Sequence, residues 1–190
     1  MIWTMSERVM NPAMVVTLVR LAITPVIMAL ILTADGDSGR LWATALFLVA
    51  TATDWVDGYL ARSRGEVTVL GTFLDSLVDK LLITGALVSL IETGDVSAWA
   101  TMIIVTREFA VTGLRMVAIN EQLVIPANQL GKWKFTAQAA AIALLIAPGT
   151  AAWLDQGMLW IALVLTIISG VYYFVVTQRR LFPRRSTSEP

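Results

Sequence analysis

The chain has 190 residues, of which 57% are hydrophobic and only 15% charged, and its formal net charge is zero. Its mean hydropathy of +0.73 lies well outside the usual range for a soluble domain, so water is not its main solvent. The sequence contains no cysteine and no histidine, which excludes disulfides, thiolate chemistry and imidazole catalysis. We expect one compact helical membrane domain over residues 1–190.

Six apolar segments follow one another along the chain, each close to the roughly 20 residues that a membrane-spanning helix needs. They cover residues 14–33, 41–60, 71–91, 98–118, 130–147 and 159–176. Turn-rich or charged stretches separate them, including DGDSGR, ETGD and APGTAAWLDQG. No alternating pattern of barrel strands is visible, so helix is the spanning form. The sequence predicts an all-α integral membrane protein with six transmembrane helices around a cytoplasm-facing polar cavity.

Small and aromatic residues suggest how these helices pack and where they end. Gly85, Gly113 and Gly170 lie inside predicted helices, where glycine lets two helices approach closely. Tryptophans fall near predicted helix ends, as aromatic residues at a membrane interface do. They are Trp42, Trp55, Trp99, Trp133, Trp153 and Trp160. We interpret the glycines as helix contacts and the tryptophans as interfacial anchors.

The basic residues are distributed unevenly between the two ends of the predicted helices. With the N-terminus inside, thirteen of the fourteen lysines and arginines lie at or toward the cytoplasmic ends, and Arg40 alone falls on the other side. The positive-inside rule then places the short N-terminal segment, residues 1–13, and the basic tail, residues 177–190, in the cytoplasm. The tail is expected to contact anionic lipids. The polar start, MIWTMSERVMNP, does not resemble a cleavable signal peptide.

Four aspartates flank the loop between the second and third apolar segments. Asp54 and Asp57 are three residues apart near the end of one helix, and Asp75 and Asp79 are four apart at the start of the next, so each pair projects from one face. The short loop makes the two helices antiparallel neighbours. Carboxylates in a membrane domain usually face an internal cavity or a partner. The four carboxylates can therefore converge near the cytoplasmic surface.

Four negative charges at one place repel one another unless they take up protons or bind cations. Two divalent ions would neutralise them, and ligation by oxygen alone suits Mg²⁺ or Mn²⁺. Paired metals of this kind can hold the attacking and leaving oxygens of a phosphoryl displacement. Gly58 and Ala61 leave room for a bulky ligand, and Arg62 offers a fork for phosphate or a nucleotide edge. The alternative is solvation of the carboxylates at helix ends, with Arg62, Arg64 and Lys80 as partners.

The pattern Asp54-x2-Asp57-Gly58-x2-Ala61-Arg62-x8-Gly71-x3-Asp75-x3-Asp79 resembles the motif of the CDP-alcohol phosphotransferases at every fixed position and spacing. The resemblance implies six membrane helices, a homodimer in a bacterial inner membrane, and two divalent cations held by the aspartates. It also implies transfer of a phosphatidyl group from CDP-diacylglycerol to an alcohol, with release of CMP and no nucleic-acid partner. Asp79 is then the general base. The implied nucleotide contacts are Thr17, Gly58, Ala61, Arg62, Thr68 and Gly71.

Two downstream segments bear on the acceptor alcohol. REFAVTGLR, residues 107–115, and GKWKFTAQ, residues 131–138, resemble segments typical of the phosphatidylglycerophosphate synthases within that family. Their acceptor, glycerol 3-phosphate, is a small dianion that must enter a site already rich in carboxylates. The resemblance therefore implies that cationic side chains border the acceptor.

Four basic residues are the candidates for acceptor binding. Arg107 and Arg115 are eight residues apart, about 80° around a helix axis, so both can border one cavity. Lys132 and Lys134 enter from the next helix. Plainer interpretations are open for each: Arg107 can pair with Glu108, Arg115 can reach toward lipid headgroups, and the lysines can reflect the positive-inside bias.

Rival functions follow from the same features. The nearest uses the same chemistry on another acceptor, such as inositol phosphate, serine or a second phosphatidylglycerol. A cation transporter would have acids spread through the membrane depth and often repeat symmetry, whereas these acids cluster toward one face and no repeat is visible. A metal-binding membrane protein without catalysis is the third alternative, and release of CMP from CDP-diacylglycerol would exclude it.

Overall fold

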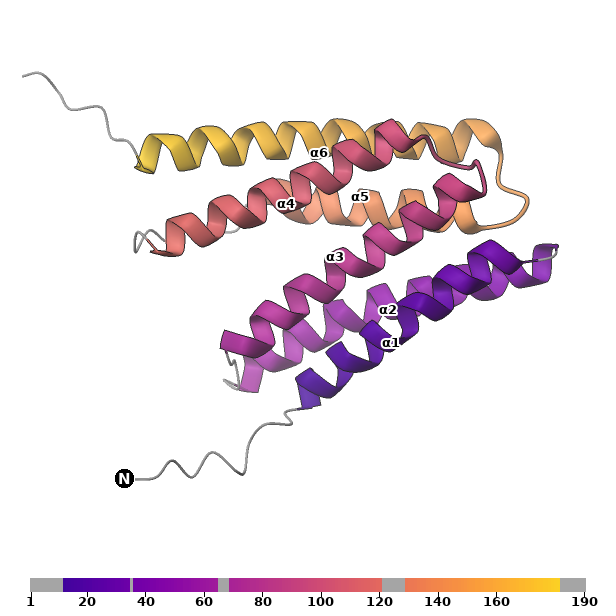
Figure 1. Cartoon of the computed structure of the whole chain (residues 1–190), viewed down its shortest axis with the longest axis horizontal. Coiled ribbons are helices and arrows are strands. Elements are labelled where there is room, and N and C mark those ends of the chain that lie inside the picture. Colours follow the sequence, from indigo (N-terminus) through magenta and orange to yellow (C-terminus); the bar gives the residue numbers. More distant parts are fainter. Residues whose placement is uncertain (1–11, 35, 65–68, 121–128, 182–190) are drawn as a thin grey trace, which may run out of the picture. The chain divides into compact units, whose positions relative to one another are not determined.

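The computed structural model describes residues 12–34, 36–64, 69–120 and 129–181, with side chains for all of these except 12–14, 54–64, 69–76, 119–120 and 181. Six helices follow one another along these residues (Figure 1). They are α1 (Pro12–Thr33), α2 (Asp37–Arg64), α3 (Val69–Glu92), α4 (Ala98–Asn120), α5 (Gln129–Ile146) and α6 (Ala152–Leu181). No strand occurs in the described ranges, so the predicted all-α class is confirmed.

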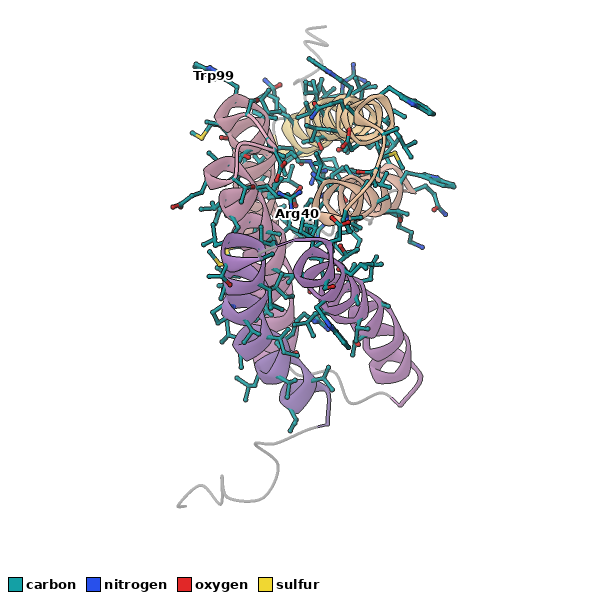
Figure 2. The ribbon with its side chains drawn as sticks, turned by 90° about the vertical axis from the view of Figure 1, so that its right-hand side faces the viewer. Arg40 and Trp99 are labelled. Carbon is teal, nitrogen blue, oxygen red and sulfur yellow. The ribbon has the colours of Figure 1, made fainter. Side chains whose placement is uncertain are left out.

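Two stretches of the described residues are long and apolar enough to cross a membrane, Val15–Thr33 in α1 and Ala152–Arg180 in α6. Both helices expose large apolar side chains, for example Val26 and Val171, as helices that contact hydrocarbon do. Trp99, at the beginning of α4, is 81% exposed and points away from the ribbon (Figure 2). Exposed tryptophan at a helix end is typical of a membrane interface. For the other four helices, membrane spanning stays a prediction.

The tryptophans predicted as anchors are exposed wherever their side chains are described. These are Trp42, Trp99, Trp133, Trp153 and Trp160. The side chain of Trp55 lies outside the described residues. This exposure agrees with the anchoring role, which stays a prediction, but Trp160 lies eight residues inside α6 because that helix begins at Ala152.

The chain divides into two compact units, Met1–Val96 with Ile142–Thr150, and Ser97–Ala141 with Ala151–Pro190. In the first unit, α1 packs against both α2 and α3. Its apolar core combines side chains from all three helices. Its largest fully buried side chains include Ile27, Phe47, Leu87 and Leu90. The first unit is thus a helical bundle centred on α1, and the prediction of one domain over residues 1–190 stays a prediction.

Gly85 lies where α3 packs closely on α1. A Cβ atom at this position would lie 2.9 Å from Met28 Sδ and 3.2 Å from Thr24 Cγ2. Gly113, on α4, has nothing within 4 Å among the described residues. The predicted helix contact is therefore confirmed at Gly85, whereas at Gly113, where the described residues leave open space, it stays a prediction.

We expect Gly85→Leu to lower the free energy of unfolding by about 1–3 kcal/mol, because the added side chain overpacks the α1–α3 contact. Gly113→Leu is the matched control, since it adds the same side chain to a helix where space is open. The measurement is thermal denaturation in detergent micelles. Equal midpoint shifts for the two variants would show that α3 does not pack closely on α1 at this position.

The predicted ETGD turn between α3 and α4 is confirmed. Its last residue, Asp95, pairs with Arg40, the one basic residue predicted on the outer side of the membrane. Gly94 has φ of 81°, a left-handed conformation that glycine adopts without strain, and its backbone N–H donates to the carbonyl of Ile91 at 3.1 Å. Arg40 Nη2, at the beginning of α2 (Figure 2), donates to Asp95 Oδ2 in this turn at 2.8 Å. The one basic residue predicted on the outer side is therefore balanced by an acid.

In the second unit, α4 packs against α6, and small residues of α5 contact α6. Ala137, Ala141 and Ala162 form a buried cluster on which Met158 and Leu165 pack. Because alanine has a short side chain, the two backbones can approach closely here. This close packing positions the polar residues of α5 and α6 described below.

Helix α6 begins at Ala152, seven residues before the predicted start of the sixth segment at 159. Hydropathy located only its apolar part, and WLDQG was assigned to the connection. The amide N–H of Leu154 donates to the carbonyl of Ala151 at 2.8 Å, which begins the helix, and Asp155 lies in its first turn. An acid in the first turn stabilises the positive end of the helix dipole. The polar residues therefore begin this helix and do not interrupt it.

Candidate functional site

Asp79, predicted as the general base, contacts a buried arginine of α1. Arg20 Nη1 donates to Asp79 Oδ1 at 2.6 Å, and the arginine side chain is 2% exposed while that of Asp79 is 26% exposed. A buried guanidinium is costly without a nearby anion, and Asp79 supplies one. The ion pair therefore fixes the Asp79 carboxylate on the face of α3 that meets α1.

Helix α1 presents a polar face at this point. Thr17, Arg20 and Thr24 are spaced three and four residues apart and all three are buried. The Thr24 hydroxyl donates to the carbonyl of Arg20 at 2.9 Å, within the helix. Thr17, a predicted nucleotide contact, therefore lies on the same face as the partner of Asp79. The structure thus places Thr17 on the polar face of α1 from which Arg20 reaches Asp79 of α3.

The remaining members of the aspartate motif are placed by their backbone alone. Asp54, Asp57, Gly58, Ala61 and Arg62 belong to α2, and Gly71 and Asp75 belong to α3. Their side chains lie outside the description, and Thr68 lies wholly outside the described residues. Among the side chains that are described, no three acids come together as a metal-binding group. Convergence of the four carboxylates stays a prediction.

The acceptor candidates of the second unit meet around one acid. Glu108 Oε1 accepts hydrogen bonds from Arg107 Nη1, at 3.2 Å, and from Lys134 Nζ. All three side chains are largely buried, with exposures of 11% for Arg107, 15% for Glu108 and 5% for Lys134. The alternative pairing of Arg107 with Glu108 is therefore present in the structure, and Glu108 also accepts from Lys134.

Arg115 reaches α6 instead. Its Nη2 atom donates to the hydroxyl oxygen of Tyr173 at 3.1 Å, and its guanidinium carbon lies 5.7 Å from the centroid of the Tyr173 ring. The guanidinium carbon of Arg107 lies 5.9 Å from the same centroid. The structure thus brings Arg107, Arg115 and Lys134 into one cluster with Glu108 and Tyr173. We call these five residues the basic cluster.

Counted over its five residues alone, the basic cluster carries three cations and one carboxylate, a sum of two positive charges. That excess equals the charge of a phosphate dianion. Arg107 Nε is buried and has no hydrogen-bond partner in the described part of the chain, so it retains a donor for a ligand. Lys132 lies two residues before Lys134 on α5, and its side chain is exposed. Of the four predicted acceptor residues, Lys132 alone stands apart from the cluster.

The basic cluster continues into a buried polar seam. Gln138 Nε2, one turn after Lys134 on α5, donates to the hydroxyl of Thr166 on α6 at 2.9 Å. Thr166, Ser169, Tyr173 and Thr177 are all buried and follow one face of α6. A helix that exposes apolar residues and buries polar ones has the orientation expected in lipid, where polar side chains face the bundle interior.

Helices α4 and α6 also border an open groove of about 530 Å³. Its lining is almost wholly apolar and includes Trp99, Met102, Val171 and Phe174, with Arg107 as its charged residue. This groove is not the polar cavity predicted from the aspartates. Because that cavity involves side chains outside the description, it stays a prediction.

A family model described as CDP-alcohol phosphatidyltransferase matches residues 10–168. The chain belongs to the CDP-alcohol phosphatidyltransferase family. The matched residues include the complete aspartate motif and the residues of α4 and α5 in the basic cluster, and they end before Tyr173. The resemblance seen in the motif is therefore confirmed.

Three relatives of this CDP-alcohol phosphatidyltransferase align over most of its length. A Bacillus subtilis (strain 168) protein named CDP-diacylglycerol–glycerol-3-phosphate 3-phosphatidyltransferase is 40% identical, over 84% of this chain and 91% of the relative. A Mycobacterium tuberculosis protein named probable phosphatidylglycerophosphate synthase is 38% identical, over 95% of this chain and 88% of the relative. A Rickettsia bellii protein with the same name as the Bacillus subtilis relative is 35% identical, over 83% of this chain and 90% of the relative.

Two contacts of this CDP-alcohol phosphatidyltransferase were not predicted from its sequence. An arginine inside an apolar helix requires a nearby anion, so the position of Arg20 alone indicates that it has an acidic partner. Nothing in the residue spacing identifies that partner as Asp79, which is 59 residues away. Tyr173 lies in an apolar helix 58 residues from Arg115 and resembles an ordinary interfacial aromatic. Only the packing of α6 on α4 reveals its contacts with two arginines.

Proposed function

We propose that this family member transfers a phosphatidyl group from CDP-diacylglycerol to glycerol 3-phosphate, giving phosphatidylglycerol phosphate and CMP. The observation that carries the proposal is similarity over most of the chain, at 35–40% identity, to proteins named for this reaction or its synthase. The basic cluster supports the choice of acceptor, because its excess of two positive charges matches the glycerol 3-phosphate dianion.

The aspartates are proposed to hold the nucleotide end of the lipid substrate. Asp54, Asp57, Asp75 and Asp79 offer carboxylate oxygens only, a donor set that fits two hard divalent cations, Mg²⁺ or Mn²⁺. When bound, such ions supply positive charge to the pyrophosphate of CDP-diacylglycerol. Thr17, Gly58, Ala61, Arg62, Thr68 and Gly71 are the proposed nucleotide contacts, and of these Thr17 is placed beside Arg20 on the buried face of α1.

Asp79 is proposed to act as the general base. It accepts the proton of the 1-hydroxyl group of glycerol 3-phosphate as that oxygen attacks the lipid-side phosphorus. The bond between this phosphorus and the bridging oxygen breaks, and CMP leaves with the electron pair. The hydrogen bond from Arg20 supports this role because it fixes the carboxylate without removing its charge. Positioning and charge neutralisation then supply most of the rate.

The basic cluster is proposed to bind the phosphate of the acceptor through Arg107, Arg115 and Lys134, with exposed Lys132 as a further predicted contact. Arginine offers a planar fork that matches phosphate oxygens. The diacylglycerol chains are proposed to remain in lipid, which fits the two helices that are long and apolar enough to cross a membrane. Six membrane spans, cytoplasmic termini, a bacterial inner membrane and a homodimer complete the proposal. They follow from the sequence pattern and the family resemblance.

We expect Arg107→Ala and Arg115→Ala each to raise the KM for glycerol 3-phosphate about tenfold to a hundredfold, since each removes a charge-assisted contact to phosphate. The KM for CDP-diacylglycerol should hardly change. Arg115→Lys should recover part of the affinity, because an ammonium keeps the charge but lacks the fork. Arg40→Ala, which removes an arginine paired with Asp95 in the turn after α3, is the control and should keep both constants.

An acceptor panel tests the function itself. Purified protein in detergent is given saturating CDP-diacylglycerol with glycerol 3-phosphate, inositol phosphate, serine, phosphatidylglycerol or plain glycerol, and CMP release is measured. Glycerol 3-phosphate should be the best acceptor and plain glycerol a very poor one. Faster release with inositol phosphate or serine would assign the chain to another branch of the family. Absence of CMP release with every acceptor would favour a non-catalytic metal-binding protein or a transporter.

A further inference from the structure

Tyr173 is buried at the centre of the basic cluster, although no role in the reaction follows from its sequence position. Its side chain is 4% exposed, and it contacts both arginines proposed to bind the acceptor. Arg115 donates to its hydroxyl oxygen, and both guanidinium groups lie over its ring. Two arginines eight residues apart on α4 are thus organised by one side chain of α6.

The physical effect of this ring is to hold two like charges near each other. Two guanidinium groups repel, and each has several rotatable bonds that would otherwise leave its position variable. The negative face of an aromatic ring attracts a cation by about 0.5–2 kcal/mol depending on burial. Tyr173 offers this attraction to both groups and adds an acceptor for Arg115. Both arginines can therefore be in place before the phosphate arrives.

Gly170, one turn before Tyr173 on α6, supplies the space that Arg107 needs. A Cβ atom at Gly170 would lie 3.0 Å from Arg107 Cγ, tighter than an ordinary van der Waals contact. The predicted close contact at Gly170 is confirmed, and its partner is a functional side chain. The two α6 residues thus act on Arg107 in complementary ways: Gly170 admits its aliphatic stem, and Tyr173 holds its charged end.

We infer that Tyr173 is a positioning residue that sets the affinity for the phosphate of the acceptor by holding Arg107 and Arg115, with Gly170 making room for Arg107. This inference rests on the proposed function, in which these arginines bind glycerol 3-phosphate. It adds α6 to the acceptor site, although the family model ends at residue 168, before this part of the helix. Binding is improved because less side-chain freedom is lost when the anion binds.

The test separates the hydroxyl from the ring. Tyr173→Phe removes only the acceptor for Arg115 and should raise the KM for glycerol 3-phosphate about threefold to tenfold. Tyr173→Leu also removes the ring and should raise it further, to about tenfold to a hundredfold. For both variants, kcat at saturating acceptor and the KM for CDP-diacylglycerol should stay near their original values. Tyr172→Phe and Phe174→Leu, at exposed positions of the same helix, are the matched controls and should change neither constant.

A double variant distinguishes positioning from loss of structure. If Tyr173 acts through Arg115, then Tyr173→Phe should have little further effect once Arg115 is replaced by alanine, because coupled residues are not additive. Full additivity would overturn the inference, as would a matching loss of kcat and of affinity for both substrates.

The inference and the proposed function can fail separately. An unchanged KM for glycerol 3-phosphate in Tyr173→Leu, together with a raised KM in Arg115→Ala, would reject the role of Tyr173 and keep the acceptor site. An unchanged KM in Arg107→Ala and Arg115→Ala would reject the acceptor site itself. A Gly170→Ala variant gives an independent check, because it should raise the KM for glycerol 3-phosphate by displacing Arg107 while Gly113→Ala should not.

Discussion

Replacing Asp79 with asparagine is expected to lower the rate of CMP release at least about a hundredfold, the scale on which a positioned general base contributes. Binding of CDP-diacylglycerol should persist, because Asp54, Asp57 and Asp75 remain. Asparagine keeps an oxygen that can accept from Arg20, which is 2% exposed, so the buried guanidinium retains a partner. The measurement is single-turnover CMP release alongside equilibrium binding of the lipid nucleotide.

Asp95→Asn is the matched control for this result. Asp95 also pairs with an arginine in the first unit, at 2.8 Å from Arg40, but it lies in the turn after α3. The Asp95→Asn variant should keep the original turnover although it loses a comparable ion pair. If Asp79→Asn abolished binding of CDP-diacylglycerol as completely as Asp54→Asn, a separate role for Asp79 as base would be unsupported.

Removing divalent cations is expected to abolish activity, and adding Mg²⁺ or Mn²⁺ should restore it. The physical reason is that four carboxylates repel the pyrophosphate of the substrate unless cations lie between them. Asp54→Asn, Asp57→Asn and Asp75→Asn should each cause a loss that is only partly recovered at high Mg²⁺ concentration. CMP release is measured in EDTA and then across a titration of each ion.

The control variant for the metal site is Asp37→Asn, which removes an exposed acid from the other end of α2. It should leave the Mg²⁺ dependence unchanged. Full activity in EDTA, with the aspartate variants equally active, would contradict metal binding by the motif. Loss of activity in Asp37→Asn as large as in Asp54→Asn would mean that general changes of charge, and not this site, control the rate.

The helices were largely predictable because each contains an apolar stretch of about the same length. Four of the six observed helices begin within two residues of the predicted segments, as α4 does at Ala98. The exceptions, α2 and α6, begin earlier because hydropathy detects the apolar part of each helix and misses the polar turns before it. Asp37 and Asp155 lie in those first turns, where acids favour a helix that hydropathy alone interprets as a loop.

The aspartate motif was predictable from local spacing, since its pairs lie within one or two turns of a helix. The partners of the candidate residues were not, because they depend on which helices pack together. Arg20 and Asp79 meet only because α1 packs on α3, and Arg115 meets Tyr173 only because α4 packs on α6. Lys132 and Lys134 look alike in the sequence, yet one is exposed and the other is buried against Glu108.

The most direct test of the proposed reaction follows the oxygen of the acceptor. Purified protein is incubated with CDP-diacylglycerol and glycerol 3-phosphate that carries ¹⁸O in its 1-hydroxyl group, and the products are identified by mass spectrometry. Attack by that oxygen on the lipid-side phosphorus predicts labelled phosphatidylglycerol phosphate and unlabelled CMP in equal amounts. A lipid product without glycerol phosphate, or ¹⁸O recovered in CMP, would contradict the proposed transfer.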